Sequence, residues 1–194
     1  MIRLNLPVSE EEIRKLKTGD EVYLSGKMVT GRDAAHTYLL EKFQEDLAPV
    51  LENTVIYHCG PVVKKDKVGW SFVAAGPTTS IRDEPYEADV IKNYKVKGII
   101  GKGGMGKKTL EACGKYGAVY FHAVGGVAVV LAKSVKKVLG VYKLEEFGVP
   151  EAFWHIDVVD FPVIVTMDSH GNSIHRDVLS YSKEVKEKLF KELK

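Results

Sequence analysis

Cysteine is scarce in this sequence, and no long hydrophobic segment occurs. Only two cysteines, Cys59 and Cys113, are found among 194 residues, without a C-x-x-C pair, so no disulfide framework is expected. The longest apolar stretch, AVGGVAVVLA, is far too short to span a bilayer. The N-terminus has no apolar run behind a basic start, so we expect no signal peptide. These absences predict a soluble, cytoplasmic protein with reduced thiols and no membrane partner.

An excess of charge of either sign is also missing. The chain has 28 basic and 26 acidic residues and a net charge of +2. This balance predicts no bulk attraction to nucleic acid or to a membrane surface. We find no internal repeat and no low-complexity linker, and a chain of this length can bury roughly 70% of its unfolded surface. We therefore expect one domain that spans residues 1–194.

Strands and helices alternate through the middle of the chain. Apolar runs bounded by glycine or proline predict strands, and apolar residues at helical spacing predict helices. Ser9 and Glu12 form a capping-box pattern at the first helix. The pattern predicts an α/β fold in which helices flank a mixed sheet. The predicted strands are 2–6, 20–30, 54–60, 70–76, 96–100, 118–124, 153–160 and 161–168, and the predicted helices are 9–16, 32–47, 84–94, 107–117, 126–139 and 182–194.

A glycine-rich stretch, IIGKGGMGKKT, follows one of the predicted strands. It fits the pattern G-x-G-x-x-G through Gly101, Gly103 and Gly106, and it comes one residue short of a P-loop. Both patterns belong to proteins that bind nucleotide phosphates at a helix N-terminus. A stand-alone nucleotide-binding module is therefore one function to consider for this chain.

The residues that carry nucleotide chemistry are missing from that stretch. A dinucleotide site needs an acidic residue about 20 positions further on, but no Asp or Glu occurs between Glu111 and Glu145. A P-loop needs Ser or Thr directly after Lys107, and Lys108 stands there. The loop would still present one ammonium group, Lys102, near backbone N–H groups at a helix start, which attract anions.

Two more predicted strand ends each carry an arginine. Arg82 follows the pair Thr78–Thr79 behind one strand, and Arg32 follows another, so three strand ends present a cation once Lys102 is included. Ligands gather beyond the carboxyl ends of strands in sheet-based folds. Two guanidinium groups and one ammonium would suit a small dianion such as a dicarboxylate. The alternative is that these are unrelated exposed cations near helix starts.

Five stretches also carry a family resemblance, and they are GRDAAH, YHCGPVV, AAGPTTSIR, IIGKGGMG and FWHIDVVDFPVIVTMDSHGN. Together they resemble the β subunit of class I, iron–sulfur-dependent fumarate hydratases, which is equivalent to the C-terminal domain of the fused enzymes. The β subunit of L-tartrate dehydratase is similar. The resemblance covers nearly the whole chain in the same order, and it does not separate fumarate from tartrate as the substrate.

The resemblance implies a swivelling β/β/α domain that works with a separate α subunit. In that family the α part holds a 4Fe-4S cluster through three cysteines, so this chain is expected to hold no metal and to be inactive alone. The implied assembly is α2β2 with a homodimer contact. The implied activity is the reversible hydration of fumarate to L-malate, and dehydration of L-tartrate is the alternative within the same family.

The family's site residues fall on the strand-end residues described above. Its carboxylate-binding arginines fall on Arg32 and Arg82, its active-site lysine falls on Lys102, and its proposed catalytic base falls on Thr78, with Thr79 as a supporting neighbour. After the second threonine the chain reads SIRDEPY, whereas the fused enzymes have smaller residues there and a Met after the arginine. The arginine itself is kept at the same offset.

Four more residues near these positions, Asp33, His36, His58 and Cys59, are not assigned contact with substrate. Asp33 is expected to orient Arg32 or to cap the following helix. His36 could contact substrate, although a supporting hydrogen bond to a backbone carbonyl is the favoured interpretation. His58 and Cys59 lie in a predicted strand and are expected to be buried. The sequence assigns them no role.

Overall fold

The computed structural model describes residues 1–192, and a mixed seven-stranded sheet organises them. The strand order is β1-β2-β3-β6-β7-β9-β8, and β9 also pairs with β2, so the sheet curls back on itself. Strands β1, β2, β3, β6 and β7 are parallel neighbours, whereas β9 runs antiparallel to its neighbours β2, β7 and β8. The strands are β1 (Ile2–Leu6), β2 (Glu21–Thr30), β3 (Val55–Tyr57), β6 (Gly98–Gly101), β7 (Val119–His122), β8 (Val135–Tyr142) and β9 (Phe153–Met167).

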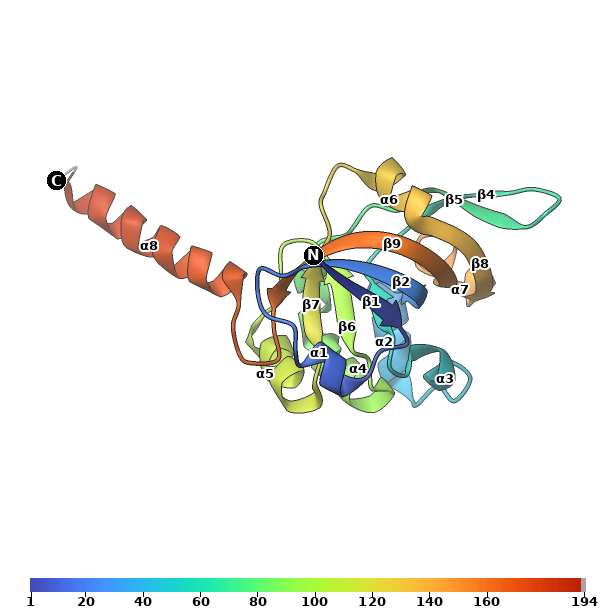
Figure 1. Ribbon diagram of the computed structural model, residues 1–194, viewed down its shortest axis with the longest axis horizontal. Helices are drawn as coiled ribbons and strands as arrows, with labels where there is room; N and C mark the ends of the chain where they lie inside the picture. Colours follow the sequence, from blue (N-terminus) through green and yellow to red (C-terminus); the bar gives the residue numbers. More distant parts are fainter. Residues whose placement is uncertain (193–194) are drawn as a thin grey trace.

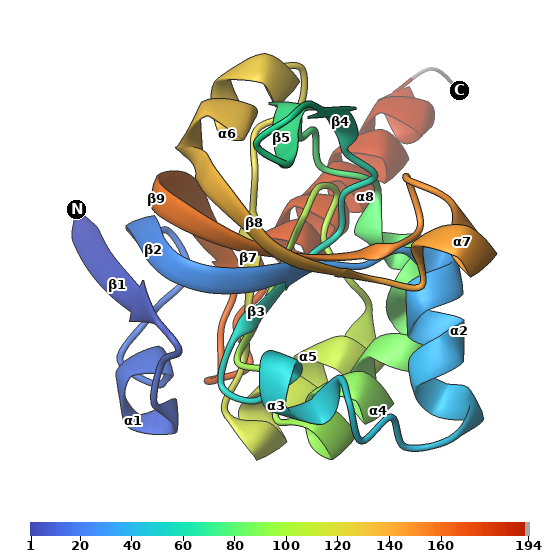
Figure 2. The same cartoon turned by 90° about the vertical axis from the view of Figure 1, so that its right-hand side faces the viewer.

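Helices cover one face of the sheet, and a helix with a β-hairpin lies over the other (Figure 1, Figure 2). On the first face lie α2 (Asp33–Glu41), α3 (Ala48–Leu51), α4 (Glu84–Tyr94) and α5 (Lys107–Tyr116). On the opposite face lie α6 (Ala128–Ser134) and the hairpin of β4 (Val62–Lys65) and β5 (Trp70–Ala74). The short elements are α1 (Glu10–Ile13), the 3-10 helix η1 (Ser80–Asp83) and α7 (Leu144–Phe147).

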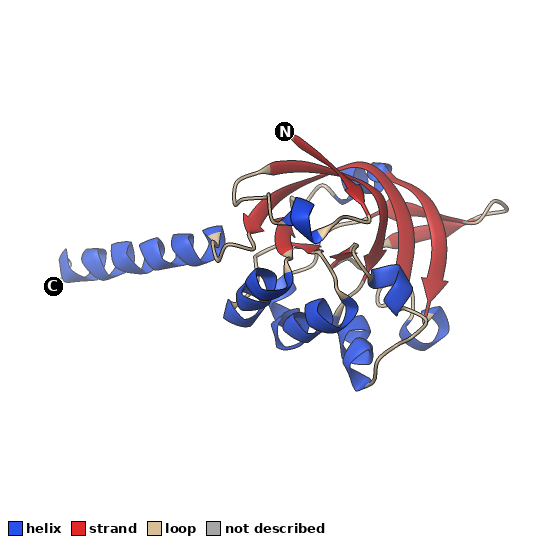
Figure 3. Ribbon diagram, turned by 60° about the horizontal axis from the view of Figure 1, so that its bottom comes forward, coloured by secondary structure: helices blue, strands red, loops and turns tan. Residues whose placement is uncertain are grey.

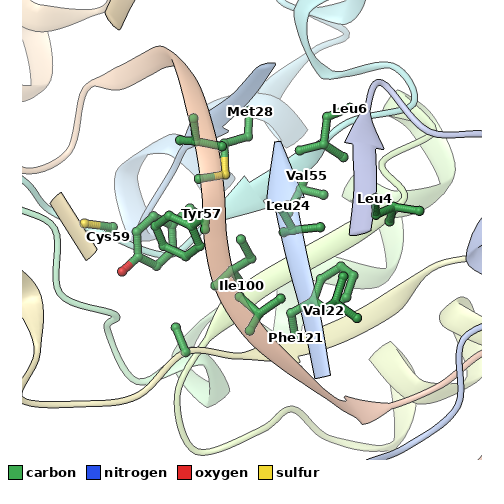
Figure 4. Packing of buried hydrophobic residues seen from close by; sticks show 14 of the residues in the cluster. Leu4, Leu6, Val22, Leu24, Met28, Val55, Tyr57, Cys59, Ile100 and Phe121 are labelled. Carbon is green, nitrogen blue, oxygen red and sulfur yellow. The ribbon is translucent and has the colours of Figure 1, made fainter. Parts of the chain in front are cut away.

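Both faces of the central strands are buried, because successive side chains of a strand point to opposite sides. Tyr57, Ile100 and Phe121 belong to the large apolar cluster on the hairpin side (Figure 4). Their neighbours Ile56 and Ile99 pack among the helices of the other face. Strands buried on both faces require continuous apolar runs, which is the pattern that the sequence shows in this part of the chain.

The predicted α/β architecture, a mixed sheet flanked by helices, is confirmed (Figure 3). Helix α4 has the predicted bounds, Glu84–Tyr94, and the capping box of Ser9 and Glu12 is formed at α1. The predicted helix at 32–47 is shorter, because α2 ends at Glu41. These elements are set by local signals, namely caps and apolar periodicity.

Two predicted elements near the C-terminus differ from the structure. The predicted helix at 126–139 ends at Ser134, and the rest is strand β8, which pairs with β9. The predicted strands 153–160 and 161–168 are one continuous strand, β9, which contains Asp160 at a φ of 50°. In both cases pairing with a strand that is distant in sequence determines the secondary structure, and the local sequence pattern does not predict that pairing.

Helix α8 (Ile174–Glu192) projects from the body of the molecule (Figure 1). It starts earlier than the predicted helix at 182–194, of which residues 193–194 lie outside the described part. Several apolar side chains along it are exposed, namely Ile174, Val178, Leu179, Tyr181, Val185, Leu189 and Phe190. Within residues 1–192, no helix combines the length and the apolar character needed to cross a membrane.

Candidate active site

Three strand ends meet beside the segment that carries the two threonines. The carboxyl ends of β2, β3 and β6 lie next to one another because these strands are parallel neighbours. The N–H of Thr78 donates to the carbonyl of His58 behind β3 at 2.7 Å. The N–H of Lys102 behind β6 donates to the carbonyl of Thr78 at 3.1 Å. Thr78 and Lys102 are therefore held side by side by the main chain.

The threonine segment reaches this position from outside the main sheet. It follows β5, which was predicted as a strand and is part of the separate two-stranded hairpin. Thr79 pairs with Lys102 in an isolated parallel bridge, and Cys59 pairs with Pro77 in an antiparallel one. The segment thus inserts between the ends of β3 and β6, as an additional strand would.

Arg32 lies over the end of β3. A Cβ atom added to Gly60 would lie 2.6 Å from Nη1 of Arg32, so the guanidinium packs directly on this glycine. Glu151 holds the guanidinium at 3.2 Å and also accepts a hydrogen bond from the N–H of Ala34 at 3.1 Å. The side chain of Arg32 is 22% exposed. It is thus fixed in place and partly open to solvent.

Arg82 is paired with Asp33 in an exposed ion pair. We expected Asp33 to orient Arg32 or to cap α2. Instead its carboxylate contacts Arg82, and α2 begins without a side-chain capping hydrogen bond. The pair ties η1 to the start of α2, which brings Arg82 next to the segment that carries Arg32.

The three predicted cations differ in how much of their charge is available. Arg32 and Arg82 each share a carboxylate of the chain itself, Glu151 and Asp33. Lys102 forms no ion pair with any residue that the structure describes. A guanidinium has more N–H donors than one carboxylate uses, so both arginines retain donors for a ligand. The two guanidinium groups and the Lys102 ammonium can therefore bind a carboxylate. Lys102 is the cation whose charge no described carboxylate of the chain neutralises.

The Thr78 hydroxyl is half-buried and already has a partner. Oγ1 donates to the carbonyl of His58 at 3.0 Å, the carbonyl that also accepts the Thr78 N–H. Thr79 is exposed, and its methyl group lies next to Gly103, where an added Cβ atom would be 3.7 Å from Cγ2. Of the two threonines, Thr78 is therefore the one that the surrounding main chain orients.

The glycine-rich stretch does not offer a free helix N-terminus. The carboxylate of Glu84 accepts hydrogen bonds from the N–H of Gly106 at 2.6 Å, the N–H of Lys108 at 3.0 Å and the hydroxyl of Thr109 at 2.6 Å. A phosphate would need these same donors. The expected attraction of this helix start for an anion near Lys102 is therefore not supported, and the nucleotide-binding alternative loses its phosphate site.

Close packing explains why the stretch needs glycine. A Cβ atom on Gly101 would overlap the hydroxyl of Ser80, and one on Gly104 would overlap the ring of His175. Gly103 and Gly104 also have φ values of 82° and 77°, which glycine adopts far more readily than other residues. The glycines serve the fold at the site and not a nucleotide.

We expect Glu84→Ala to lower the free energy of unfolding by about 2 kcal/mol, because several buried or partly buried donors lose their acceptor. Urea unfolding followed by circular dichroism measures this change. Glu111→Ala is the matched control, since Glu111 is an exposed acid on α5 with a single long ion pair, and it should change stability by less than about 0.5 kcal/mol. Equal effects of the two variants, or tight ATP binding by the wild-type chain, would contradict this interpretation of the loop.

A buried acid–imidazole group lies beneath the site. His36, His58 and Glu87 are fully buried, and Oε2 of Glu87 is 3.1 Å from Nε2 of each histidine. Burial alone disfavours the charged imidazole, but the Glu87 carboxylate outweighs it and raises the pKa of His36 to about 9. Burial likewise opposes the charge of Glu87, yet the two histidines lower its pKa to about 2. His36 and Glu87 thus form a charged pair in the interior.

The sequence-based interpretation named both histidines and missed Glu87. The supporting role favoured for His36 agrees with its Nδ1, which lies 2.8 Å from the carbonyl of Arg32. Glu87 stands on the buried face of α4 with Val90 and Ile91. An acidic residue within the apolar stripe of a helix is the signal that could have identified it.

The charged pair predicts a pH dependence of stability. The raised pKa of His36 makes its contribution complete below pH 6.5, and that contribution is lost as the pH rises toward 9. The lowered pKa of Glu87 makes its contribution complete above pH 4.5, and it is lost as the pH falls toward 2. The difference in unfolding free energy between wild type and Glu87→Gln should therefore be largest between pH 4.5 and pH 6.5, and it should shrink as the pH rises toward 9. Urea titrations across this range measure it, and a difference that grows with pH would contradict the pairing.

The two cysteines do not form a cluster site. Cys59 and Cys113 are both free and buried, on the β3 side and on α5 respectively. Burial raises the pKa of the Cys59 thiol to about 12 and raises that of Cys113 further still. Thiolate is the form that binds iron and zinc, and a cubane cluster needs more thiolates than this chain has. The residues of this chain therefore do not fit an iron–sulfur cluster.

Comparison with known proteins identifies relatives over most of the chain. Residues 1–178 match the protein family described as Fumarase C-terminus. The chain is 51% identical over 185 residues to a Geobacillus stearothermophilus protein provisionally named a class I fumarate hydratase, with 95% of this chain covered and 35% of that protein. It is 48% identical over 185 residues to a Methanocaldococcus jannaschii protein provisionally named L(+)-tartrate dehydratase subunit beta, with 94% and 93% covered.

A third relative is the L(+)-tartrate dehydratase subunit beta of Escherichia coli K12, which is 38% identical over 172 residues, with 88% of this chain and 85% of that subunit covered. The chain thus spans about a third of one relative and most of the other two. The chain belongs to the family described as Fumarase C-terminus, and its relatives include an L(+)-tartrate dehydratase subunit beta and a protein provisionally named a class I fumarate hydratase.

Proposed function

We propose that this chain is the β subunit of a hydro-lyase that interconverts fumarate and L-malate in a site shared with an α subunit. The observation that carries the proposal is that Thr78 and Lys102 meet beside the adjacent ends of β3 and β6. The guanidinium of Arg32 packs on Gly60, behind β3. Arg82 lies alongside through its pair with Asp33. The names of the relatives support a hydro-lyase, and the name subunit beta implies an α partner.

The charges suit the chemistry of this reaction. Removal of a proton next to a carboxylate places additional negative charge on that carboxylate. Lys102, which has no ion pair within the described residues, and the remaining donors of Arg32 would stabilise that charge more in the transition state than in the ground state. Because the ion pair with Glu151 and the packing on Gly60 hold the Arg32 guanidinium in advance, little reorganisation of that group would be needed during the reaction.

Thr78 is the residue we propose as the base. A threonine hydroxyl ionises far above neutral pH, so it needs nearby positive charge, and Lys102 is its main-chain neighbour. To accept a proton from substrate, the hydroxyl must turn away from the carbonyl of His58, to which it now donates. The group that protonates the departing hydroxyl would come from the other subunit.

We propose that the partner α subunit holds a 4Fe-4S cluster, since this chain's cysteines do not fit one. The proposed assembly is α2β2 with a contact between β subunits, and the chain alone is then inactive. The buried, free thiols Cys59 and Cys113 fit a reducing compartment such as the cytoplasm.

One observation favours tartrate as the second candidate. The chain covers 93% and 85% of the two relatives named as tartrate dehydratase β subunits, whereas the relative named for fumarate is a much longer protein. L-tartrate differs from L-malate by one hydroxyl group, so the same cations would bind its carboxylates. Subunit organisation thus favours tartrate, while the chemistry of the site described in this chain serves either substrate.

The test is anaerobic co-expression with a candidate α subunit from the same genome. The proposal expects a complex that hydrates fumarate, and turnover of fumarate, L-malate and L-tartrate by that complex ranks the substrates. A complex that turns over tartrate and not fumarate would replace the first candidate by the second. Binding of ATP or NAD to the chain, without any complex, would reject both.

A further inference from the structure

A fully buried polar cluster connects helix α4, which carries Glu87, with the segments of the proposed site. It consists of His36, His58 and Glu87 together with Ser80 and Tyr120, all with at most 2% exposure. None of them is among the residues to which the function above assigns contact with substrate. Buried polar groups on this scale require partners inside the protein.

The hydrogen bonds of the cluster run in one direction. The Tyr120 hydroxyl donates to Oγ of Ser80 at 2.8 Å, and Oγ of Ser80 lies 2.9 Å from Nδ1 of His58. Nε2 of His58 lies 3.1 Å from Oε2 of Glu87. With the Ser80 hydroxyl donating to Nδ1, the proton of His58 resides on Nε2 and is donated to the carboxylate. The hydroxyl groups and both ring nitrogens of His58 in this series then have partners, whereas Oε1 of Glu87 has no hydrogen-bond partner among the described residues.

His36 completes the cluster from the other side. Its Nε2 lies 3.1 Å from Oε2 of Glu87, a contact that is an ion pair and not a well-aligned hydrogen bond. Its Nδ1 lies 2.8 Å from the carbonyl of Arg32. Both ring nitrogens therefore face acceptors, which requires protons on both. Asp83 is also near, with its carboxylate oxygens 3.9 Å from Nδ1 of His36 and 3.6 Å from Nδ1 of His58.

The cluster reaches three residues of the site through four hydrogen bonds, each of which involves a main-chain carbonyl. His36 contacts the carbonyl of Arg32. The carbonyl of His58 accepts both the N–H and the hydroxyl of Thr78. Ser80 donates its N–H to the carbonyl of Lys102 at 3.1 Å. Arg32, Thr78 and Lys102 are thus each one hydrogen bond from a member of the cluster, whereas Arg82 is held by its ion pair with Asp33.

We propose that Glu87, His36 and His58 form a positioning cluster that holds Arg32, Thr78 and Lys102 in register with one another. The inference rests on the function proposed above. The physical basis is that one buried carboxylate fixes the orientation of two imidazoles, as carboxylates do for histidines in many active sites. His58 is then the central positioning residue, because the same residue bonds Glu87 through its ring and Thr78 through its carbonyl.

The same three side chains are also a possible donor set for zinc. Two histidines and a glutamate bind zinc in some enzymes, and the ligand atoms of this group lie within 4.8 Å of one another. A metal needs the lone pair of a ring nitrogen, whereas both nitrogens of His36 face acceptors here. We therefore assign protons, and not a metal ion, to the ring nitrogens of His36. Titration with zinc tests this assignment.

Glu87→Gln is the principal test variant, because it keeps the shape and removes the charge, and His36 can then become neutral. In the assembled enzyme it should lower kcat/KM by about 10- to 100-fold. In a Thr78→Ala background the same substitution should lower activity by a smaller factor than it does in the wild type, since one of the three residues that it positions is already lost. Full activity of Glu87→Gln, or effects that multiply in the double variant, would overturn the proposal.

A second measurement does not depend on activity. Amide hydrogen exchange of the full chain should be faster by about 10-fold or more at Thr78, Ser80 and Lys102 in Glu87→Gln, with the β1–β2 ladder unchanged. If no hydro-lyase activity is found at all, the proposed function fails while this measurement still tests the cluster. Exchange that is unchanged at these three amides would overturn the positioning role.

Two further variants and a zinc titration complete the test. Ser80→Ala removes a smaller part of the cluster, so it should show the same exchange pattern if Glu87→Gln does not fold. Glu111→Gln, an exposed acid on α5, is the matched control and should change neither activity nor exchange. Stoichiometric binding of zinc to the wild-type chain that is lost in Glu87→Gln would overturn the proposal in favour of a metal site.

Discussion

Alanine in place of Thr78 should reduce turnover of the assembled enzyme by about 10²- to 10⁴-fold, the range typical of losing a general base. The substitution removes the hydroxyl but leaves the main-chain hydrogen bonds to His58 and Lys102. The subunits should therefore still assemble, and KM should change much less than kcat. Steady-state hydration of fumarate, followed by absorbance, together with size-exclusion chromatography of the complex, measures both effects.

Thr37→Ala is the matched control for this prediction. Thr37 is an exposed threonine on α2 whose hydroxyl donates to a backbone carbonyl, that of Asp33. Loss of the same chemical group there should leave turnover within about 2-fold of wild type. If Thr78→Ala retains full activity, Thr78 has no part in the reaction and the base must come from the partner. A complex that no longer assembles would assign Thr78 a structural role instead.

Methionine in place of Lys102 should lower kcat/KM by about 10²- to 10³-fold, the scale found when one preorganised electrostatic contact is removed. The reason is specific to this residue. Arg32 and Arg82 share their charge with Glu151 and Asp33, whereas Lys102 has no ion pair within the described residues. The effect should appear in kcat as well as in KM, because the charge that it stabilises increases in the transition state.

Lys107→Met is the matched control for Lys102→Met. Lys107 lies a few residues further along the same glycine-rich stretch, and its side chain is 88% exposed. Its loss should leave kcat/KM within about 2-fold of wild type. Equal losses in the two variants would indicate that the general charge of the loop matters and not the position of Lys102. Arginine at position 102 should restore little activity, because a guanidinium is larger and its donors have a fixed geometry.

Local sequence signals were sufficient for many elements of the fold. The capping box at Ser9 and the apolar periodicity of Glu84–Tyr94 gave helices where they were predicted. The second half of the predicted helix at 126–139 became strand β8, because pairing with β9 outweighs local helical preference. Nothing in the sequence of that segment reports its partner.

The site shows the same division. Strand-end spacing was sufficient to select Arg32 and Lys102 as candidates, since the parallel strands β2 and β6 end at one edge of the sheet. Arg82 was selected by the same reasoning, but it follows β5 of the separate hairpin and reaches the site from outside the sheet. Spacing did not reveal that Glu151 and Asp33 already pair with the two arginines. Contacts between residues so far apart in the chain depend on how elements pack, which a single sequence does not express.

The sequence by itself determined the family, the α/β class and the identity of the residues presented at the strand ends, because motifs and periodicity are local properties of the chain. Only the tertiary structure decided what the glycine-rich stretch is for. Glu84 reaches from α4 to occupy the helix start that a phosphate would need, and Ser80 and His175 fill the space beside Gly101 and Gly104. Tertiary structure also decided the role of Glu87, because the effect of a buried charge depends on the groups that contact it, here His36 and His58 from other elements.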